Sequence, residues 1–209
     1  MIIRNISDVK VVVDTLTEGQ PVIVPTDTVY GLCASAVDNE AVNRLFTLKE
    51  RDKVKPLQLL VPDEWEYLKK YPMSSGLKSL IQKIPRGKVT WLFPNSPGLS
   101  SELCPYFRGL KYLGIRSPVH PLWDEIFQYY DFSIAATSAN ISGQPVFDEA
   151  EIIRVFGNTV SLICLEDTPF SSESSAVIRF TGSSSVEIIR KSALLSDDIY
   201  HKLEQFLSG

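Results

Sequence analysis

The sequence predicts an α/β fold in which a single domain, residues 1–209, contains a twisted mixed sheet flanked by helices. Two observations lead to this prediction. Short apolar runs of strand length alternate along the chain with longer segments whose apolar residues recur every three or four positions. No linker long enough to separate two domains interrupts this alternation, and 209 residues can bury one full core.

Residues that start and stop helices define the first elements. Ser7 has the chemistry of an N-cap and Gly19 that of a helix stop, so a helix is expected between them. Asp38 is expected to begin a second helix, which ends near Lys49. The other elements expected up to residue 93 are strands over 22–24, 57–61 and 89–93, a short helix opened by Pro62 that runs to residue 68, and a helix over 77–84.

Pro, Ser and Gly are frequent between residues 94 and 105, which predicts a long surface loop or a lid over the site. His120 is expected to be a helix-entry residue rather than a catalytic base. The elements expected after this loop are strands over 112–116, 133–136, 160–165, 176–180 and 186–189, and helices over 122–129, 148–156 and 197–207.

Composition excludes several classes of protein. A formal net charge of -4 and a pI near 5.3 argue against a protein whose whole surface binds nucleic acid, although a local basic patch occupies residues 44–55. Three scattered cysteines and two histidines indicate neither a disulfide framework nor a zinc site. No apolar run approaches the roughly 20 residues of a membrane span, and the N-terminus lacks the features of a signal peptide. A cytoplasmic location is therefore expected.

Polar loops follow several of the expected strands, at the edge where α/β proteins bind ligands. The first loop contains Thr26, Asp27 and Thr28, and the third, residues 137–143, is rich in hydroxyl and amide groups. Between them, the cations of residues 49–55 converge at the start of a strand, an arrangement that suits a polyphosphate. We expect these loops to form the walls of one pocket, with Asp27 as its only acidic residue.

Each of these residues also has a plainer interpretation. The stem of Lys49 shares the buried face of its helix, but its ammonium could simply cap that helix and reach water. The threonine hydroxyls could cap their own turn. Arg116, at the end of a strand, could bind a carboxylate or form a surface salt bridge. The chain has no Walker A loop, dinucleotide fingerprint or nucleophile elbow.

The loops, in their order and spacing, resemble the YrdC-like family of threonylcarbamoyl-AMP synthases, in its short, single-domain form. The matching segments are residues 25–32, Lys49-x-Arg51 with the Pro-Leu pair at 56–57, residues 114–121 and residues 137–145, with weaker matches at Ser175 and at 189–190. The resemblance covers about residues 19–193. It implies an enzyme that makes threonylcarbamoyl-adenylate and pyrophosphate from ATP, L-threonine and bicarbonate or CO₂, for threonylcarbamoyladenosine modification of tRNA.

The resemblance also implies roles for individual residues. Thr28, Arg116 and Ser175 would bind threonine. The nucleotide would be held by Lys49, Arg51, Ser138, Asn140 and Arg190, of which Lys49 and Arg51 would be catalytic. Lys55, which belongs to the cation cluster, is expected to bind the nucleotide as well. Mg²⁺ would arrive with ATP and need no dedicated protein ligands. Proteins that transfer the threonylcarbamoyl group to tRNA would receive the product.

The chain departs from the family pattern at a few positions. Asp27 stands where many members have Glu, Leu60 where many have His, Lys55 where Asn is frequent, and Ser192 where Gly is found. Two other functions remain open: a double-stranded RNA or tRNA binding protein of the same fold, and a carbamoyl-adenylate domain of hydrogenase maturation, although that domain normally sits in a longer chain with zinc-finger motifs.

Overall fold

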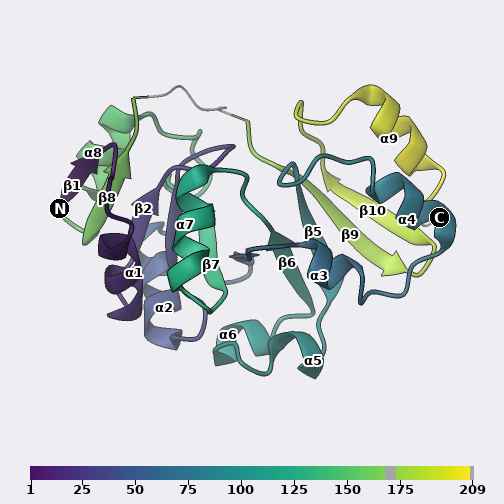
Figure 1. Ribbon diagram of the computed structural model, residues 1–209, viewed down its shortest axis with the longest axis horizontal. Coiled ribbons are helices and arrows are strands. Elements are labelled where there is room, and N and C mark those ends of the chain that lie inside the picture. Colours follow the sequence, from purple (N-terminus) through teal and green to yellow (C-terminus); the bar gives the residue numbers. More distant parts are fainter. Residues whose placement is uncertain (168–172, 208–209) are drawn as a thin grey trace.

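The computed structural model describes residues 1–167 and 173–207. Within these residues, ten strands form one sheet in the order β1-β8-β2-β3-β7-β4-β6-β5-β9-β10. Both parallel pairs, such as β4 with β6, and antiparallel pairs, such as β5 with β6, occur in it. Helices pack against the sheet toward both of its ends (Figure 1). The predicted mixed α/β fold is confirmed.

The strands are β1 (Ile2–Arg4), β2 (Val22–Val24), β3 (Gly31–Ser35), β4 (Gln58–Leu60), β5 (Val89–Pro94), β6 (Tyr112–Arg116), β7 (Ile134–Ser138), β8 (Leu162–Leu165), β9 (Ala176–Gly182) and β10 (Ser185–Arg190). The helices are α1 (Lys10–Thr17), α2 (Asn39–Leu48), α3 (Trp65–Leu68), α4 (Ser75–Ile81), α5 (Pro97–Ser100), α6 (Pro105–Arg108), α7 (Pro121–Tyr129), α8 (Glu149–Phe156) and α9 (Asp197–Glu204).

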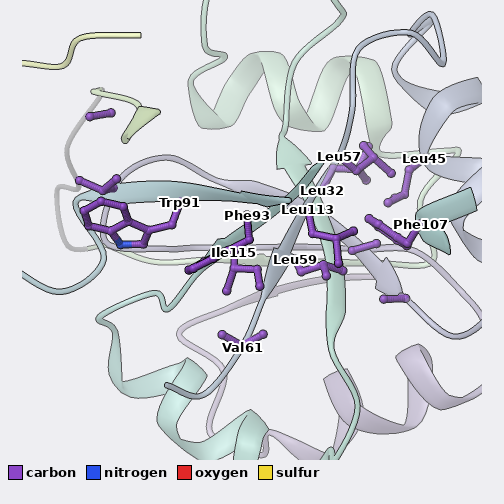
Figure 2. Packing of buried hydrophobic residues seen from close by; sticks show 14 of the residues in the cluster. Leu32, Leu45, Leu57, Leu59, Val61, Trp91, Phe93, Phe107, Leu113 and Ile115 are labelled. Carbon is purple, nitrogen blue, oxygen red and sulfur yellow. The ribbon is translucent and has the colours of Figure 1, made fainter. Parts of the chain in front are cut away.

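The alternation of side chains along each strand divides the sheet into two faces. On one face, Leu59, Trp91 and Ile115 enter a large core that helices on that side complete (Figure 2). On the other face, α1 and α7 contribute Leu16, Ile126 and their neighbours to a smaller core that covers β2, β3, β7 and β8 and extends as far as Leu60 on β4. Among the described residues, no helix covers the remaining part of this second face, over β4, β6, β5 and β9.

The structure corrects several predicted boundaries. The first helix begins at Lys10 rather than at Ser7, because the Asp8 carboxylate accepts the Lys10 N–H at 3.0 Å. Strands β1 and β3 were not predicted: β1 is three residues long, and β3 follows a polar turn that hides its start. The helix expected from Pro62 begins three residues later, at Trp65.

The segment between residues 94 and 105 is not a lid. It contains α5 and the start of α6, and α6 packs beside α2. The Cys104 N–H donates to the Ala36 carbonyl at 2.9 Å, and Phe107 lies in the large core, on the opposite face from the uncovered strands. Within the described ranges 1–167 and 173–207, no helix is long and apolar enough to cross a membrane.

Candidate functional site

A cavity of about 330 Å³ lies on the uncovered part of the sheet. Its floor consists of side chains that alternate with core residues, including Gln58 and Leu60 from β4, Thr90 and Leu92 from β5, and Arg116 from β6. Loops at the strand ends form its rim. The rim and remaining floor residues are Thr26, Thr28, Val29, Gly31, Arg51, Pro56, Leu57, Gly114, Ala136, Thr137, Ser138, Ser174, Ser175, Val177, Ile189 and Arg190.

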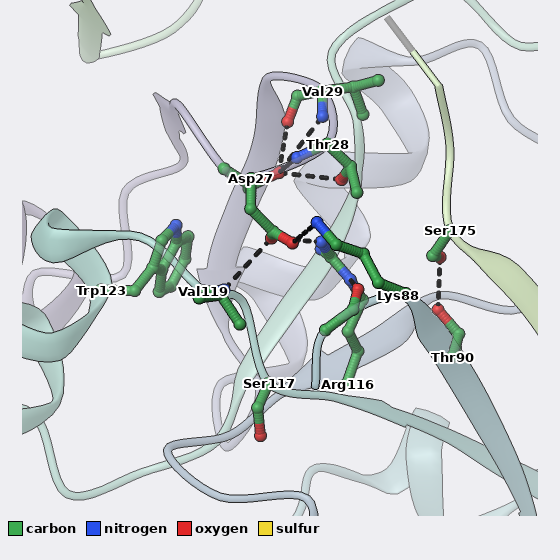
Figure 3. A network of polar contacts seen from close by, with 12 residues as sticks. Asp27, Thr28, Val29, Lys88, Thr90, Arg116, Ser117, Val119, Trp123 and Ser175 are labelled. Atoms are coloured by element: carbon green, nitrogen blue, oxygen red, sulfur yellow. Dashed lines mark hydrogen bonds and ion pairs between the residues drawn. The ribbon is translucent and has the colours of Figure 1, made fainter. Parts of the chain in front are cut away.

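The guanidinium of Arg116 is fixed by two protein contacts at this cavity (Figure 3). Its Nε donates to the Gly87 carbonyl at 2.7 Å, and its Nη2 pairs with Asp27 Oδ1 at 2.5 Å. Asp27 also accepts from Lys88 Nζ at 3.1 Å and from the Val119 N–H at 3.2 Å. The salt bridge of Arg116 is thus buried, not on the surface, and Asp27 faces these donors rather than lining the cavity as expected.

A second carboxylate, Glu64, supports the same region from the core side. Glu64 is buried, and its oxygens accept the backbone N–H groups of Ser117 at 2.8 Å and Gly87 at 3.4 Å. Burial raises the pKa of Glu64, while these N–H groups and the charge of Arg116 lower it. Glu64 therefore holds in place the end of β6, which carries Arg116, and the turn that carries its carbonyl partner Gly87.

Both threonines of the turn before β3 line the cavity, and the Thr26 hydroxyl is bonded within the turn itself. Thr26 Oγ1 donates to the Val29 carbonyl at 2.7 Å and accepts the N–H groups of Thr28 and Val29 at 3.1 and 3.2 Å. Thr28 Oγ1 lies 3.0 Å from Thr26 Oγ1. The plainer interpretation of a self-capping turn is thus correct for Thr26, and this turn fixes the position of Thr28.

Lys49 is buried, with 1% of its surface exposed, and it does not line the cavity. Its ammonium donates to the carbonyl oxygens of Ser138 at 2.6 Å and Asn140 at 2.9 Å, and to the side-chain oxygens of the same residues at 3.2 and 2.6 Å. Burial, together with the nearby charge of Arg51, lowers the pKa of Lys49 to about 7. The Lys49 ammonium is thus held by the loop after β7 and does not stand free in water.

Asn140 is likewise occupied within its own loop. Its Nδ2 donates to the carbonyls of Ile141 and Gln144 at 3.1 and 2.6 Å, and its Oδ1 also accepts from Ser138 Oγ at 2.6 Å. Asn140 does not line the cavity, whereas Ser138 does. The predicted nucleotide loop therefore presents Ser138, and Lys49 and Asn140 hold that loop in shape.

Two further arginines line the cavity, Arg51 in the loop after α2 and Arg190 at the end of β10. Arg51 Nε and Nη2 donate to the carbonyls of Lys55 and Pro56 at 2.8 and 2.9 Å. Arg190 Nε and Nη2 donate to the Ser175 carbonyl at 3.1 and 2.7 Å. Burial lowers the pKa of both guanidinium groups, and among the described residues neither forms an ion pair with a carboxylate. Lys55 itself is exposed and does not line the cavity.

Nine residues were predicted for the site, and the cavity brings six of them together. These six are Thr28, Arg51, Arg116, Ser138, Ser175 and Arg190; Lys49, Lys55 and Asn140 lie outside its lining. Sequence reasoning missed Gln58 and Thr90, which line the floor. Their signal was a polar residue between apolar neighbours in a strand, which here marks the uncovered face of the sheet.

Comparison with known proteins gives a consistent set of relatives. The model of the Sua5, YciO and YrdC family, which carries the description "Telomere recombination", matches residues 14–192. Threonylcarbamoyl-AMP synthase of Yersinia enterocolitica is 31% identical over 157 residues, which are 73% of this chain and 80% of that protein. Threonylcarbamoyl-AMP synthase of Homo sapiens is 33% identical over 138 residues, or 65% of this chain.

The fold has the same relatives. The crystal structure of P. abyssi Sua5 complexed with L-threonine superposes with a TM-score of 0.80 at 26% identity, over 99% of this chain and 61% of that one. The human match covers 47% of that protein, so this chain spans about half the length of some of its relatives and most of the length of others.

Proposed function

Because the chain belongs to the family of Sua5, YciO and YrdC domains, we propose that it is an L-threonylcarbamoyladenylate synthase. This nucleotidyltransferase makes threonylcarbamoyl-AMP and pyrophosphate from ATP, L-threonine and bicarbonate or CO₂. The names of the relatives support the reaction, and the cavity supports the substrates. The observation that carries the proposal is the meeting of Thr28, Arg116 and Ser175 with Arg51, Ser138 and Arg190 around one cavity.

The chemistry needs little from a general base. The threonine amine and bicarbonate condense to a carbamate with loss of water. One carbamate oxygen attacks the α-phosphorus of ATP, and pyrophosphate leaves with the electrons of the broken P–O bond. Because the carbamate is already an anion, the protein has to position it and neutralise charge rather than remove a proton. The described residues of the cavity lining supply hydroxyls, one amide and guanidinium groups but no carboxylate, and this set suits that task.

Arg116 is the group we assign to the threonine carboxylate. Its burial removes competing water, and its contacts with Asp27 and Gly87 fix the guanidinium plane before the ligand arrives. Thr28 and Ser175 supply hydroxyls to the same cavity. The threonine site is therefore built on residues that the fold already holds rigid.

Arg51 and Arg190 are the groups we assign to the triphosphate. Both line the cavity, and both donate hydrogen bonds to backbone carbonyls. Within the described ranges no carboxylate pairs with either guanidinium, so their positive charge remains available to a ligand. Ser138 adds a hydroxyl at the end of β7. We assign Lys49 as a positioning residue, because its ammonium holds the Ser138 carbonyl and hydroxyl in place.

Mg²⁺ enters this proposal as part of the nucleotide substrate. Among the described residues no group of three or more His, Cys, Asp or Glu side chains is arranged to hold a metal. An ion carried on the phosphates, with water as its other ligand, fits a cavity lined by hydroxyls and guanidinium groups.

The proposal is tested by following pyrophosphate release from ATP, Mg²⁺ and bicarbonate with the purified protein. We expect release that requires threonine, falls when bicarbonate is removed, and is weaker with serine. Omission of each substrate in turn is the control. Pyrophosphate release that does not depend on threonine would overturn the assignment.

The cellular setting belongs to the same proposal. We place the protein in the cytoplasm, where its product would pass to proteins that modify tRNA. Binding of tRNA or double-stranded RNA is the weaker alternative; the exposed residues Lys53 and Lys55 are its only support in the described loop beside the cavity. Salt-sensitive RNA binding without synthase activity would favour that alternative.

A further inference from the structure

Three polar side chains form a hydrogen-bonded row across the cavity floor. Ser175 Oγ lies 2.9 Å from Thr90 Oγ1, a contact drawn in Figure 3. Thr90 Oγ1 donates to Gln58 Oε1 at 2.8 Å. Thr90 and Ser175 are buried, and Gln58 is half-buried. The row joins β4, β5 and the start of β9, and all three residues line the cavity.

Gly114 makes this row possible. Gln58 on β4 lies opposite Gly114 on β6, and Leu92 of β5 lies opposite Gly114 on the other side. A Cβ at Gly114 would meet Leu92 Cδ2 at 3.1 Å, Thr90 Cγ2 at 3.3 Å and Gln58 Cβ at 3.6 Å. Because position 114 has no side chain, the Gln58 amide can pass over β6 and reach Thr90.

The row has a fixed direction. A threonine hydroxyl carries one hydrogen, and that of Thr90 goes to Gln58 Oε1. Thr90 must therefore accept the hydrogen of Ser175, which leaves the Ser175 oxygen with lone pairs for a ligand. Within the described part of the chain, no hydrogen bond occupies Gln58 Nε2, so this amide keeps two donors. One end of the row accepts, and the other donates.

We propose that the row of Gln58, Thr90 and Ser175 reads the side-chain hydroxyl of the amino-acid substrate. This inference rests on the proposed function and adds Gln58 and Thr90 to the residues that determine its specificity. A hydroxyl both donates and accepts, so it can give its hydrogen to Ser175 Oγ and accept from Gln58 Nε2. Leu60, Leu92 and Val177 line the same floor and suit the methyl group that threonine carries beside its hydroxyl. A substrate without the hydroxyl leaves both ends of the row unpaired.

The test compares L-threonine with L-2-aminobutyrate, which lacks only the hydroxyl oxygen, by calorimetric titration of the full chain. The wild type should bind threonine more tightly by about tenfold or more, the effect of one lost hydrogen-bonding group. Thr90→Val keeps the shape of the side chain and breaks the row. We expect it to weaken threonine binding about tenfold and to leave 2-aminobutyrate binding within about twofold, so that the ratio approaches one.

Two further variants make the result specific. Thr90→Ser keeps the hydroxyl and should restore the preference for threonine. Thr181→Val makes the same change on β9 at an exposed position outside the cavity lining, and should behave as the wild type. A Thr90→Val protein that keeps the wild-type ratio, or that loses both ligands equally, overturns the inference.

Pyrophosphate release measured in parallel separates this inference from the proposed function. If the wild type shows threonine-dependent release while Thr90→Val keeps the preference for threonine, the row is wrong and the synthase assignment stands. If the ratio depends on Thr90 but no pyrophosphate is released, the row is supported and the synthase assignment fails. A wild type that does not distinguish the two amino acids overturns the row directly.

Discussion

Lys49 and Arg51 are two residues apart in the sequence, yet their charges lie in opposite environments. Four oxygens of Ser138 and Asn140 surround the Lys49 ammonium, which is almost fully buried outside the cavity lining. Arg51 is half-buried, holds two backbone carbonyls and lines the cavity. A cluster of cations at the start of a strand can thus contain one residue that builds the site and one that meets the ligand.

The helix that ends between them causes the difference. Lys49 is the C-cap of α2 and follows the apolar side of that helix inward, toward the loop after β7. Glu50 then takes a positive φ of 49°, which turns the chain, and Arg51 points back over its own loop. A stability measurement and an activity measurement should therefore respond differently to the two residues.

Lys49→Met should give the largest effect. It removes the donor to four oxygens in a buried loop, and we expect the free energy of unfolding to fall by about 3 kcal/mol. Chemical denaturation measures this loss, with Lys78→Met, at an exposed lysine on α4, as the matched control. An unfolding free energy equal to that of the control would mean that the Lys49 contacts contribute nothing to the fold.

Arg51→Ala should act on the reaction instead. Loss of a cation that faces the triphosphate is expected to lower kcat/KM by about a hundredfold. The free energy of unfolding should change by less than about 1 kcal/mol, because only hydrogen bonds within a partly exposed loop are lost. Lys53→Ala, on the same loop but outside the cavity lining, is the control. Normal turnover in the Arg51 variant would remove this residue from the mechanism.

The pH dependence of stability sharpens the comparison further. The pKa of Lys49 is about 7 in the folded protein and 10.5 in its ordinary state. Between these values the unfolded chain binds more protons than the folded one, so the free energy of unfolding should rise with pH. From this group the rise is on the order of 1 kcal/mol per pH unit. Denaturation curves of the wild type and Lys49→Met, measured from pH 7 to 10, should diverge as pH rises. Parallel profiles would contradict the lowered pKa.

The sequence was sufficient for the architecture and for much of the cavity lining. Alternation of apolar runs predicted the mixed α/β fold, and polar residues after strands predicted that the loops of Thr28 and Ser138 line one cavity. Arg116 was added to that cavity by the family resemblance. The sequence did not show which residues of each polar loop line the cavity. Lys49 donates to Asn140 Oδ1, and these two residues are 91 positions apart in the sequence. Such a long-range pairing leaves no local pattern.

The floor residues were missed for a different reason. Gln58 and Thr90 each stand between apolar neighbours, which is also the pattern of an ordinary strand with one solvent-facing side. Only the position of α1 and α7, which cover part of that face and leave the rest bare, turns this pattern into a cavity. Helix placement of this kind depends on packing across the whole sheet.

Lys55→Ala should give the smallest effect and completes the comparison along this loop. The predicted role of Lys55 in nucleotide binding rested on its place in the cation cluster, but its side chain is exposed and outside the cavity lining. Its carbonyl holds Arg51, and that contact survives the substitution. We expect KM for ATP and kcat to stay within about twofold of the wild type, as for other exposed charges.

Steady-state kinetics at low and high salt measures this, since a long-range attraction of ATP by Lys55 would disappear at high salt. A rise of KM for ATP comparable to that of Arg51→Ala would place Lys55 at the nucleotide after all, and would mean that the loop closes over the triphosphate when ATP binds.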